Sequence, residues 1–304
     1  MKRGWCPTLE RPMDAADGTL VRVRPPLGRL HAHAARALAD AAERWGNGRM
    51  ELTSHANIQV RGVRDVRAFA ALAGLPSPPG RVIVSPLAGD DPDCAADTLP
   101  VAAELEARLA REGVPHPKWT AVVDGGGALS LDEVPADLRT RLAPGGAAEI
   151  LRAGPLSYRG GQAFGFGLPF GELPAPVLRA LAALSERHAD GTLRLTPWRC
   201  LVLGRVERPD VVEPPPGTVA DPADPVLLTA ACVGSDGCAH GTVPARTVAR
   251  RLARPGLHVS GCAKGCAHPG PAALTLVGRD GAFDLVRNGR AGDAPHRNGL
   301  RFTA

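Results

Sequence analysis

Four cysteines toward the C-terminal end of the chain have the types and spacing of a metal-binding set. Cys232 and Cys238 have five residues between them, Cys262 and Cys266 have three, and all four fall within 35 residues. Thiolates hold iron–sulfur clusters, and the backbone around such a core must curl closely and donate N–H bonds to the sulfurs. Glycines at 234, 237, 241, 261 and 265 provide that freedom. The pattern predicts a 4Fe–4S cluster bound by these four cysteines.

Three other uses of the cysteines are compatible with the residues. Structural zinc also accepts four thiolates, but its paired ligands are usually two to four residues apart, so the first pair fits zinc poorly. Disulfides are disfavoured because no signal peptide or membrane-spanning apolar run is present, and we expect a reducing, cytoplasmic location. Unliganded buried thiols are the third alternative. We expect Cys6, Cys94 and Cys200 to be ordinary buried or surface thiols.

The composition is that of an ordinary globular protein. Of its 304 residues 44% are hydrophobic, which is enough to bury a substantial core. The net charge is +5, with 36 Lys and Arg against 31 Asp and Glu. No basic run with interleaved aromatic residues is present, which argues against a nucleic-acid partner. A mildly basic protein of this kind is compatible with a polyanionic small molecule.

An internal duplication organises the chain. A shift of 143 positions aligns Val21–Val63 with Phe164–Val206 without a gap, and fourteen of the 43 pairs are identical. Each copy contains Pro-x-Gly-x-Leu and later Leu-Thr, and each predicts a strand, a turn, a helix and two further strands. We expect these elements at Leu20–Arg24, Leu30–Trp45, Met50–Thr53 and Asn57–Arg61, and at Phe164–Gly167, Leu173–His188, Leu193–Thr196 and Cys200–Leu203.

This order of elements predicts an α+β fold. In each half a helix would cover an antiparallel sheet, and the two halves could pair into a larger sheet around a pseudo-twofold axis. The segment between the halves predicts strands at Val82–Val84 and Thr120–Asp124 and a helix at Val101–Arg111. Gly125-Gly126-Gly127 lacks the spacing of a phosphate-binding loop and is interpreted as a turn. The proline-rich part of Glu207–Pro225 predicts a linker.

The cysteine spacing and the repeat together resemble the sulfite and nitrite reductase superfamily. C-x5-C followed by C-x3-C, the latter inside Ser-Gly-Cys-x-x-Gly-Cys-x-x-Pro at 260–269, is similar to the cluster signature of that superfamily. Leu52–Val63 resembles its ferredoxin-like half-domain. Three further segments, at 84–89, 118–127 and 258–269, resemble its precorrin-3B synthase family in particular.

The resemblance implies a division into five segments. Residues 5–75 and 155–207 would be the two ferredoxin-like half-domains, and 80–150 a reductase-like α/β domain between them. Residues 208–225 would be the linker, and 226–304 the reductase-like domain that carries the 4Fe–4S cluster.

The resemblance also implies an activity. A member of the precorrin-3B synthase family would be an oxygen-dependent monooxygenase that converts precorrin-3A to precorrin-3B in aerobic cobalamin biosynthesis, by ring hydroxylation with lactone formation. It would combine the cluster with a mononuclear non-haem iron and accept electrons from reduced nicotinamide or a ferredoxin-type donor. The alternatives are a sirohaem-dependent sulfite or nitrite reductase and a non-catalytic tetrapyrrole-binding or electron-carrying scaffold.

The anion site of the superfamily is only partly present. His55 stands where an arginine is usual, Arg81 is one place out of register after Gly80, and Thr120 replaces a lysine. Because a small oxyanion needs several cations for its reduction, these changes argue against a sulfite or nitrite reductase.

Basic residues near these positions are candidate partners of a polycarboxylate macrocycle. They are His55, Arg61, Arg81, Lys118 and Lys264, with solvated surface charge as the alternative. By the resemblance, Cys266 is the cluster ligand nearest the tetrapyrrole, or nearest a haem iron if sirohaem is bound. No pattern of two histidines and a carboxylate for a mononuclear iron is legible, and the histidines at 31, 33, 55, 240, 258 and 268 are more readily explained as structural.

Overall fold

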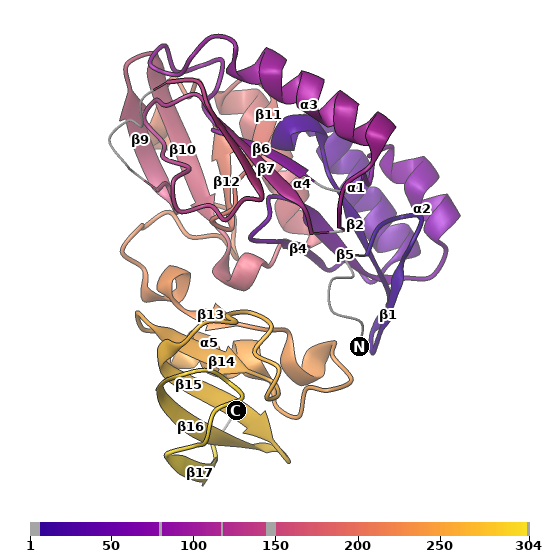
Figure 1. Cartoon of the computed structure of the whole chain (residues 1–304), viewed down its shortest axis with the longest axis vertical. Helices are drawn as coiled ribbons and strands as arrows, with labels where there is room; N and C mark the ends of the chain where they lie inside the picture. The colour runs from indigo at the N-terminus through magenta and orange to yellow at the C-terminus, as the bar shows by residue number, and fades with distance from the viewer. Residues whose placement is uncertain (1–6, 79–80, 117, 144–149, 303–304) are drawn as a thin grey trace. The chain divides into compact units, whose positions relative to one another are not determined.

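The computed structural model describes residues 7–78, 81–116, 118–143 and 150–302. The chain forms two compact units (Figure 1), one containing most described residues up to Pro222 and the other containing Asp14–Gly18 and those from Ala223 onward. Among the described residues, every helix is too short or too polar to span a lipid bilayer.

The first unit contains two copies of one α+β half-domain. In the first copy β2 (Gly18–Val23) is followed by α1 (Ala32–Trp45), β4 (Met50–Leu52) and β5 (Ile58–Val63), and β1 (Met13–Ala15) extends the sheet to the order β1-β2-β5-β4. The second copy has β10 (Gly161–Gly167), α4 (Ala175–His188), β11 (Thr192–Leu195) and β12 (Cys200–Leu203). Both helices begin and end 143 residues apart, which confirms the duplicated α+β fold.

A short segment of the first copy joins the sheet of the second. β3 (Arg29–His31) pairs antiparallel with β11, giving the order β3-β11-β12-β10-β9, where β9 is Gly154–Tyr158. The predicted start of the first helix at Leu30 is therefore wrong, because Leu30 is paired with Leu193 in this sheet. Helical periodicity cannot reveal such an exchange, since an apolar residue satisfies both environments.

The two copies are joined by reciprocal hydrogen bonds. The amide of Ala32 donates to the carbonyl of Gly191 at 2.9 Å, and the amide of Ala175 donates to that of Gly48 at 3.0 Å. Each residue is 143 positions from its counterpart in the other bond, so the pair obeys the predicted pseudo-twofold axis. Two ion pairs between α1 and α4 are related by the same offset of 143 residues: Arg36–Glu186 and Arg179–Glu43.

The Pro-x-Gly motif forms an equivalent tight turn in both copies. Its residues form the 3-10 turns Pro26–Gly28 and Pro169–Gly171, in which Leu27 and Phe170 have φ of 49° and 58°. The following glycines also have positive φ, and a Cβ on Gly171 would lie 2.3 Å from the carbonyl oxygen of Leu52. Glycine is needed here for both its conformation and its size.

The remainder of the first unit is a small parallel sheet with a covering helix. β6 (Arg81–Val84), β7 (Thr120–Asp124) and β8 (Leu138–Arg141) are parallel, and α3 (Thr98–Glu112) packs on them, beginning three residues before the predicted start. The helix α2 (Val66–Ala73) packs on α1.

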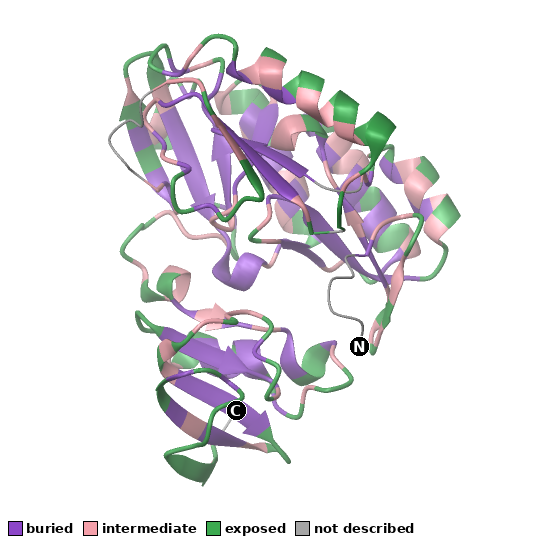
Figure 2. Ribbon diagram, viewed as in Figure 1, coloured by how far each residue is buried: buried purple, intermediate pink, exposed green. Residues whose placement is uncertain are grey.

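A single apolar core joins the two copies. Leu38 of α1 and Leu181 of α4 are fully buried in it, together with Ile58 and Phe166 from the two sheets. Figure 2 shows the inner strands of the two half-domain sheets buried and the outward faces of α2 and α3 exposed. One face of each half-domain sheet is thus committed to packing, which leaves the other face for different uses.

The second unit has a five-stranded mixed sheet. Its order is β13-β14-β15-β16-β17, in which the first three strands are parallel. The bounds are Ala230–Ala231, Leu257–Ser260, Ala272–Arg279, Ala282–Gly289 and Arg297–Leu300, with α5 at Ala245–Arg251 and 3-10 turns at Pro225–Leu228 and Gly234–Asp236. A further 3-10 turn, Pro209–Val211, belongs to the first unit.

Candidate functional site

The four cysteines follow the ends of two neighbouring parallel strands. Cys232 comes directly after β13, and Cys262 comes two residues after the end of β14. Because these strands are parallel, their carboxyl ends lie at the same edge of the sheet. The amide of Cys232 donates to the carbonyl of Val259 at 3.3 Å, so pairing continues into the cysteine loop.

Glycines let three segments of this region pack in direct contact. A Cβ on Gly241 would lie 2.3 Å from the carbonyl carbon of Gly234, and one on Gly261 would lie 2.8 Å from the Cα of Gly234. Gly234 and Gly265 have φ of 64° and 63°, so they also meet the predicted need for conformational freedom. At Gly241 and Gly261 glycine is needed because a larger side chain would collide with the neighbouring backbone.

The thiols lie within electrostatic range of one another. The pKa of Cys266 is raised by desolvation and by the charges of Cys232, Cys262 and Cys238, whereas Lys264 opposes the shift. The amide of Gly261 donates to Sγ of Cys232 at 3.1 Å, as the sulfurs of a cluster require.

This donor set fits a cluster. No three His, Cys, Asp or Glu side chains in the described part of the chain are placed to hold one metal ion. The four ligands of a 4Fe–4S cluster bind four different irons, so they surround a larger core and need not converge on a point. Four thiols from two loops at one sheet edge, with an amide already donated to sulfur, meet that requirement.

His55 lies at the tip of the hairpin between β4 and β5. The hairpin is closed by a hydrogen bond from Thr53 Oγ1 to Asn57 Oδ1 at 2.8 Å and by one from the Ala56 amide to the Thr53 carbonyl at 3.1 Å. Desolvation and four cations, in the order Arg81, Arg22, Lys118 and Arg24, lower the pKa of His55 to about 3. The imidazole is therefore neutral near neutral pH.

Arg81 is held rigidly beside this hairpin. It is only 3% exposed, its Nε donates to Thr120 Oγ1, and one of its Nη atoms donates to the Lys118 carbonyl. The Thr120 hydroxyl in turn donates to the Lys118 carbonyl at 3.1 Å. Thr120 thus positions a neighbouring cation.

Arg61 has a different environment from the other candidate residues. Its Nε is 3.1 Å from Glu51 Oε1 in a buried ion pair. The other Glu51 oxygen accepts from Gln59 Nε2 at 2.6 Å, and Gln59 Oε1 accepts from Nε and Nη2 of Arg22 at 3.1 and 2.9 Å. Arg61 therefore belongs to a buried relay that ends on Arg22.

A cavity of about 750 Å³ lies at the end of this relay, within the first unit. Four of its nine polar lining residues are arginines, and its apolar wall comes from leucine, valine and proline side chains. The polar lining residues are Thr8, Glu10, Arg11, Arg22, Arg24, Asn57, Ser77, Arg81 and His116. Sequence reasoning missed Arg22 and Arg24. The signal for Arg22 was the alternation of β2, which places this arginine on the face opposite the apolar core.

The corresponding face of the second copy is apolar. At the positions equivalent to Arg22, Arg24, Gln59 and Arg61, which lie 143 residues further on, stand Gly165, Gly167, Val202 and Gly204. Cys200 and Val202 there pack into a separate apolar cluster with Leu87 and Leu129. At these four positions the second copy has no polar side chain.

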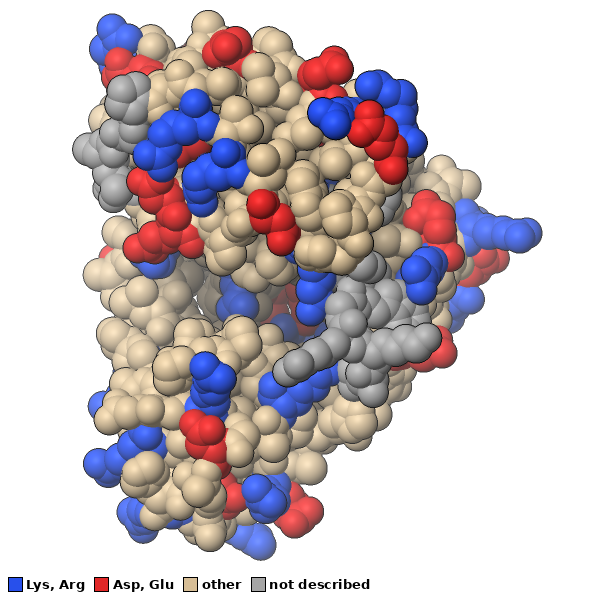
Figure 3. Space-filling view, in the orientation of Figure 1, with Lys and Arg blue, Asp and Glu red and all other residues tan. Residues whose placement is uncertain are grey.

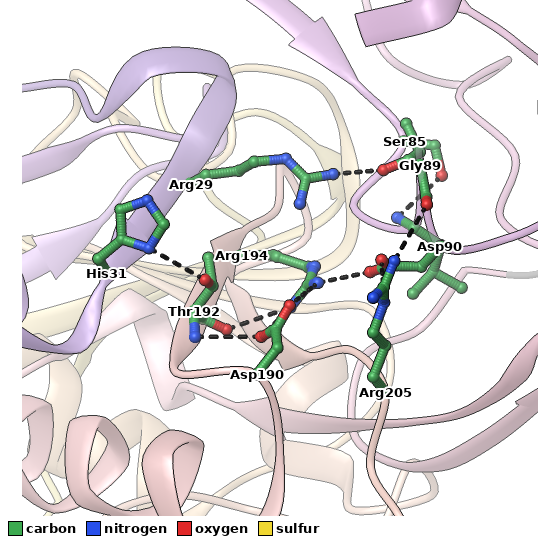
Figure 4. Close-up of polar contacts among 11 residues, drawn as sticks. Arg29, His31, Ser85, Gly89, Asp90, Asp190, Thr192, Arg194 and Arg205 are labelled. Carbon is green, nitrogen blue, oxygen red and sulfur yellow. Dashed lines mark hydrogen bonds and ion pairs between the residues drawn. The ribbon is translucent and has the colours of Figure 1, made fainter. Parts of the chain in front are cut away.

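The charged residue that does occur on the second copy has a structural role (Figure 4). Arg194, 1% exposed, pairs with Asp90 and with Asp190, and Arg205 Nε is 2.7 Å from Asp90 Oδ1. Arg29 of β3 donates to the carbonyl of Ala88. These contacts fasten the loop after β6 to the second half-domain.

The remaining candidates are not among the residues that line this cavity. Lys264 is an exposed residue of the second unit, next to the cysteines. Burial raises the pKa of both Cys94 and Cys200, which are ordinary buried thiols, and Cys6 and Gly80 lie outside the described residues. His31 and His33, which were not expected to share a helical face, stack at 5.9 Å because His31 precedes the helix, and the rings of His258 and His268 are 5.7 Å apart.

The fold and the cysteine centre define a protein of the sulfite and nitrite reductase fold. Residues 11–75 and 158–213 match the family of nitrite/sulfite reductase ferredoxin-like half domains. A solved structure of the Mycobacterium tuberculosis NirA protein is 18% identical, with a TM-score of 0.64 over 93% of this chain and 77% of that chain. A precorrin-3B synthase from Sinorhizobium sp is 31% identical over 97% of this chain and 85% of that protein. The chain belongs to the precorrin-3B synthase family.

Proposed function

We propose that this protein is an oxygen-dependent monooxygenase that converts precorrin-3A to precorrin-3B, hydroxylating a ring carbon while an acetate side chain closes a lactone. The observation that carries the proposal is the 31% identity to a precorrin-3B synthase over 97% of the chain. The basic cavity of the first unit supports it, because a tetrapyrrole with acetate and propionate side chains needs several cations and an apolar wall.

In this proposal the two units have separate tasks. Cys232, Cys238, Cys262 and Cys266 would hold a 4Fe–4S cluster, which supplies electrons one at a time from reduced nicotinamide or a ferredoxin-type donor. Arg22, Arg24 and Arg81 bind substrate carboxylates. Thr120 holds Arg81 in place, so less side-chain entropy is lost when Arg81 binds a carboxylate. The fixed guanidinium also orients the macrocycle.

Anaerobically purified protein with an intact cluster, given precorrin-3A, a reductant and dioxygen, should release the hydroxylactone with one oxygen atom from dioxygen. Mass spectrometry with labelled dioxygen measures this directly. Sirohaem absorption bands together with sulfite or nitrite reduction, or stoichiometric binding of precorrin-3A without product, would overturn the proposal.

A further inference from the structure

One cation lies between the two cysteines of the second pair. Lys264 is two residues from Cys262 and two residues from Cys266, and it is exposed. Because a chain spans at most about 3.6 Å per residue, the Cα of Lys264 lies within about 7 Å of the Cα of each cysteine, whatever the conformation of the loop. Its ammonium group therefore stays close to a cluster that these thiolates hold.

The backbone is anchored on both sides of Lys264. Before it, the Ser260 hydroxyl donates to the Cys262 carbonyl at 2.7 Å. After it, Gly265 has φ of 63°, and a Cβ there would lie 3.1 Å from the Cβ of Ala291. The loop thus presents Lys264 from a fixed place.

The charged side chains in the sequence around Lys264 all have one sign. Residues 237–279 contain six Lys and Arg and no Asp or Glu. A 4Fe–4S cluster becomes one charge more negative when it accepts an electron, and its reduction potential depends on charge and solvent exposure around it. A cation held beside the cluster stabilises the reduced form more than the oxidised form, because the attraction grows with the negative charge.

We propose that Lys264 raises the reduction potential of the cluster, so that the cluster accepts an electron from a weaker reductant. The proposal rests on the cluster of the proposed function and goes beyond it by naming the residue that tunes the transfer of electrons from the donor. Lys264 is not among the residues that line the basic cavity, which agrees with a role other than contact with substrate carboxylates.

The size of the effect follows from Coulomb's law. At a separation of about 8 Å, one unit charge in screened, water-exposed surroundings changes the ratio of reduced to oxidised cluster about threefold. Salt weakens the effect, because the Debye length falls from about 10 Å at about 0.1 M to about 3 Å at about 1 M. A purely structural role of the side chain would not depend on salt in this way.

A redox titration of the full-length, cluster-containing protein tests the proposal, with the EPR signal of the reduced cluster as the readout. At the native midpoint potential and about 0.1 M salt, the ratio of reduced to oxidised cluster should fall about threefold in Lys264→Gln and about tenfold in Lys264→Glu. Lys264→Arg retains the charge and should match the native protein. At about 1 M salt the differences among the variants should largely disappear.

Arg254→Gln is the matched control, because it removes an equal charge elsewhere in the second unit. Arg254 is exposed and precedes β14, whereas Cys262 follows that strand, so the four residues of β14 separate the two positions by about 13 Å. This variant should change the ratio by less than about 1.5-fold. Coproporphyrin, a tetrapyrrole tetracarboxylate, should bind Lys264→Gln as tightly as it binds the native protein.

A native midpoint potential in Lys264→Gln, a shifted one in Lys264→Arg, an equal shift in Arg254→Gln, or shifts that persist at about 1 M salt would overturn the inference. Weaker coproporphyrin binding by Lys264→Gln would also count against it and favour contact with the substrate. Iron and sulfide analysis separates failure of this inference from failure of the proposed function. Without a cluster in the native protein both are wrong, whereas a native cluster with an unchanged midpoint potential removes only the role of Lys264. Because no turnover is measured, absence of hydroxylation leaves a measured shift valid.

Discussion

At the scale of single residues, the two candidate sites depend on different kinds of side chain. The cysteine centre needs thiolates at fixed places, whereas the cavity needs cations that are oriented by buried partners. Both requirements can be tested by substitutions with matched controls.

The four cysteines should be required for iron binding. Replacement of Cys238 by Ser should reduce bound iron and acid-labile sulfide from about four atoms each per chain to a small fraction, because one iron loses its thiolate ligand. Cys94→Ala, at a buried thiol of the first unit, should retain full iron. Equal loss of iron in both variants would show that iron content depends on the general stability of the protein and not on Cys238 as a ligand.

Glu51 should act as a positioning residue for Arg22. Glu51→Ala leaves Arg61 buried without its carboxylate, at a cost of about 3–5 kcal/mol measured by denaturant unfolding. The double variant Glu51→Leu with Arg61→Leu should recover much of that stability. Its porphyrin binding should be weak, because Gln59 has lost the Glu51 carboxylate and no longer fixes Arg22. Recovery of binding together with stability would exclude the positioning role.

His55 should also lower the acid stability of the free protein. Its pKa is below the unfolded value, so the unfolded state binds more protons between about pH 6.5 and about pH 3. Stability is therefore lost as the pH falls through that window, by at most about 1.4 kcal/mol per pH unit. His55→Gln should reduce this loss in chemical denaturation at several pH values, and identical profiles would contradict the assignment.

At the scale of elements, close packing of glycine backbones shapes the cysteine loops. Gly241→Ala would place a Cβ against the backbone of Gly234, which overpacks the site by about 1–3 kcal/mol and should lower cluster content. Gly292→Ala, whose Cβ would lie 3.6 Å from the carbonyl oxygen of Ala263, is the control. Iron analysis after reconstitution distinguishes them, and normal cluster content in Gly241→Ala would show that the loops tolerate a side chain there.

The elements of the repeats could be predicted because apolar periodicity and the 143-residue offset support each other. The exchange of β3 could not be predicted, since Leu30 is apolar in either assignment. The cysteine set is predicted from spacing alone, and the cluster that it would hold stays a prediction. The role of Arg22 was not, because it depends on Gln59 and Glu51, which only strand pairing brings together.

At the scale of the whole molecule, the net charge is confined to one part of the chain. Residues from 223 onward have ten Lys and Arg against five Asp and Glu, and the rest of the chain is balanced. On the face drawn in Figure 3, charges of both signs are interspersed. A protein donor with acidic surface charge would therefore be attracted mainly to the cysteine-bearing segment.

The rate of reduction by a protein donor should depend on this charge. Reduction by an acidic ferredoxin-type protein should slow about tenfold as salt rises from low to high concentration, because screening removes the steering. Reduction by a small photoreduced flavin, which has no protein docking step, should change little. Stopped-flow absorbance follows both, and a protein-donor rate independent of salt would argue against charged docking.

The paired hydrogen bonds between Ala32 and Gly191 and between Ala175 and Gly48 have an evolutionary consequence. Reciprocal contacts of this kind are those that two identical subunits make across a symmetric interface. A single half-domain with this sequence pattern would therefore be a subunit of a homodimer with two equal outer faces. Within one chain, the two faces are no longer required to be equal. One face could then acquire arginines while the other became part of the core.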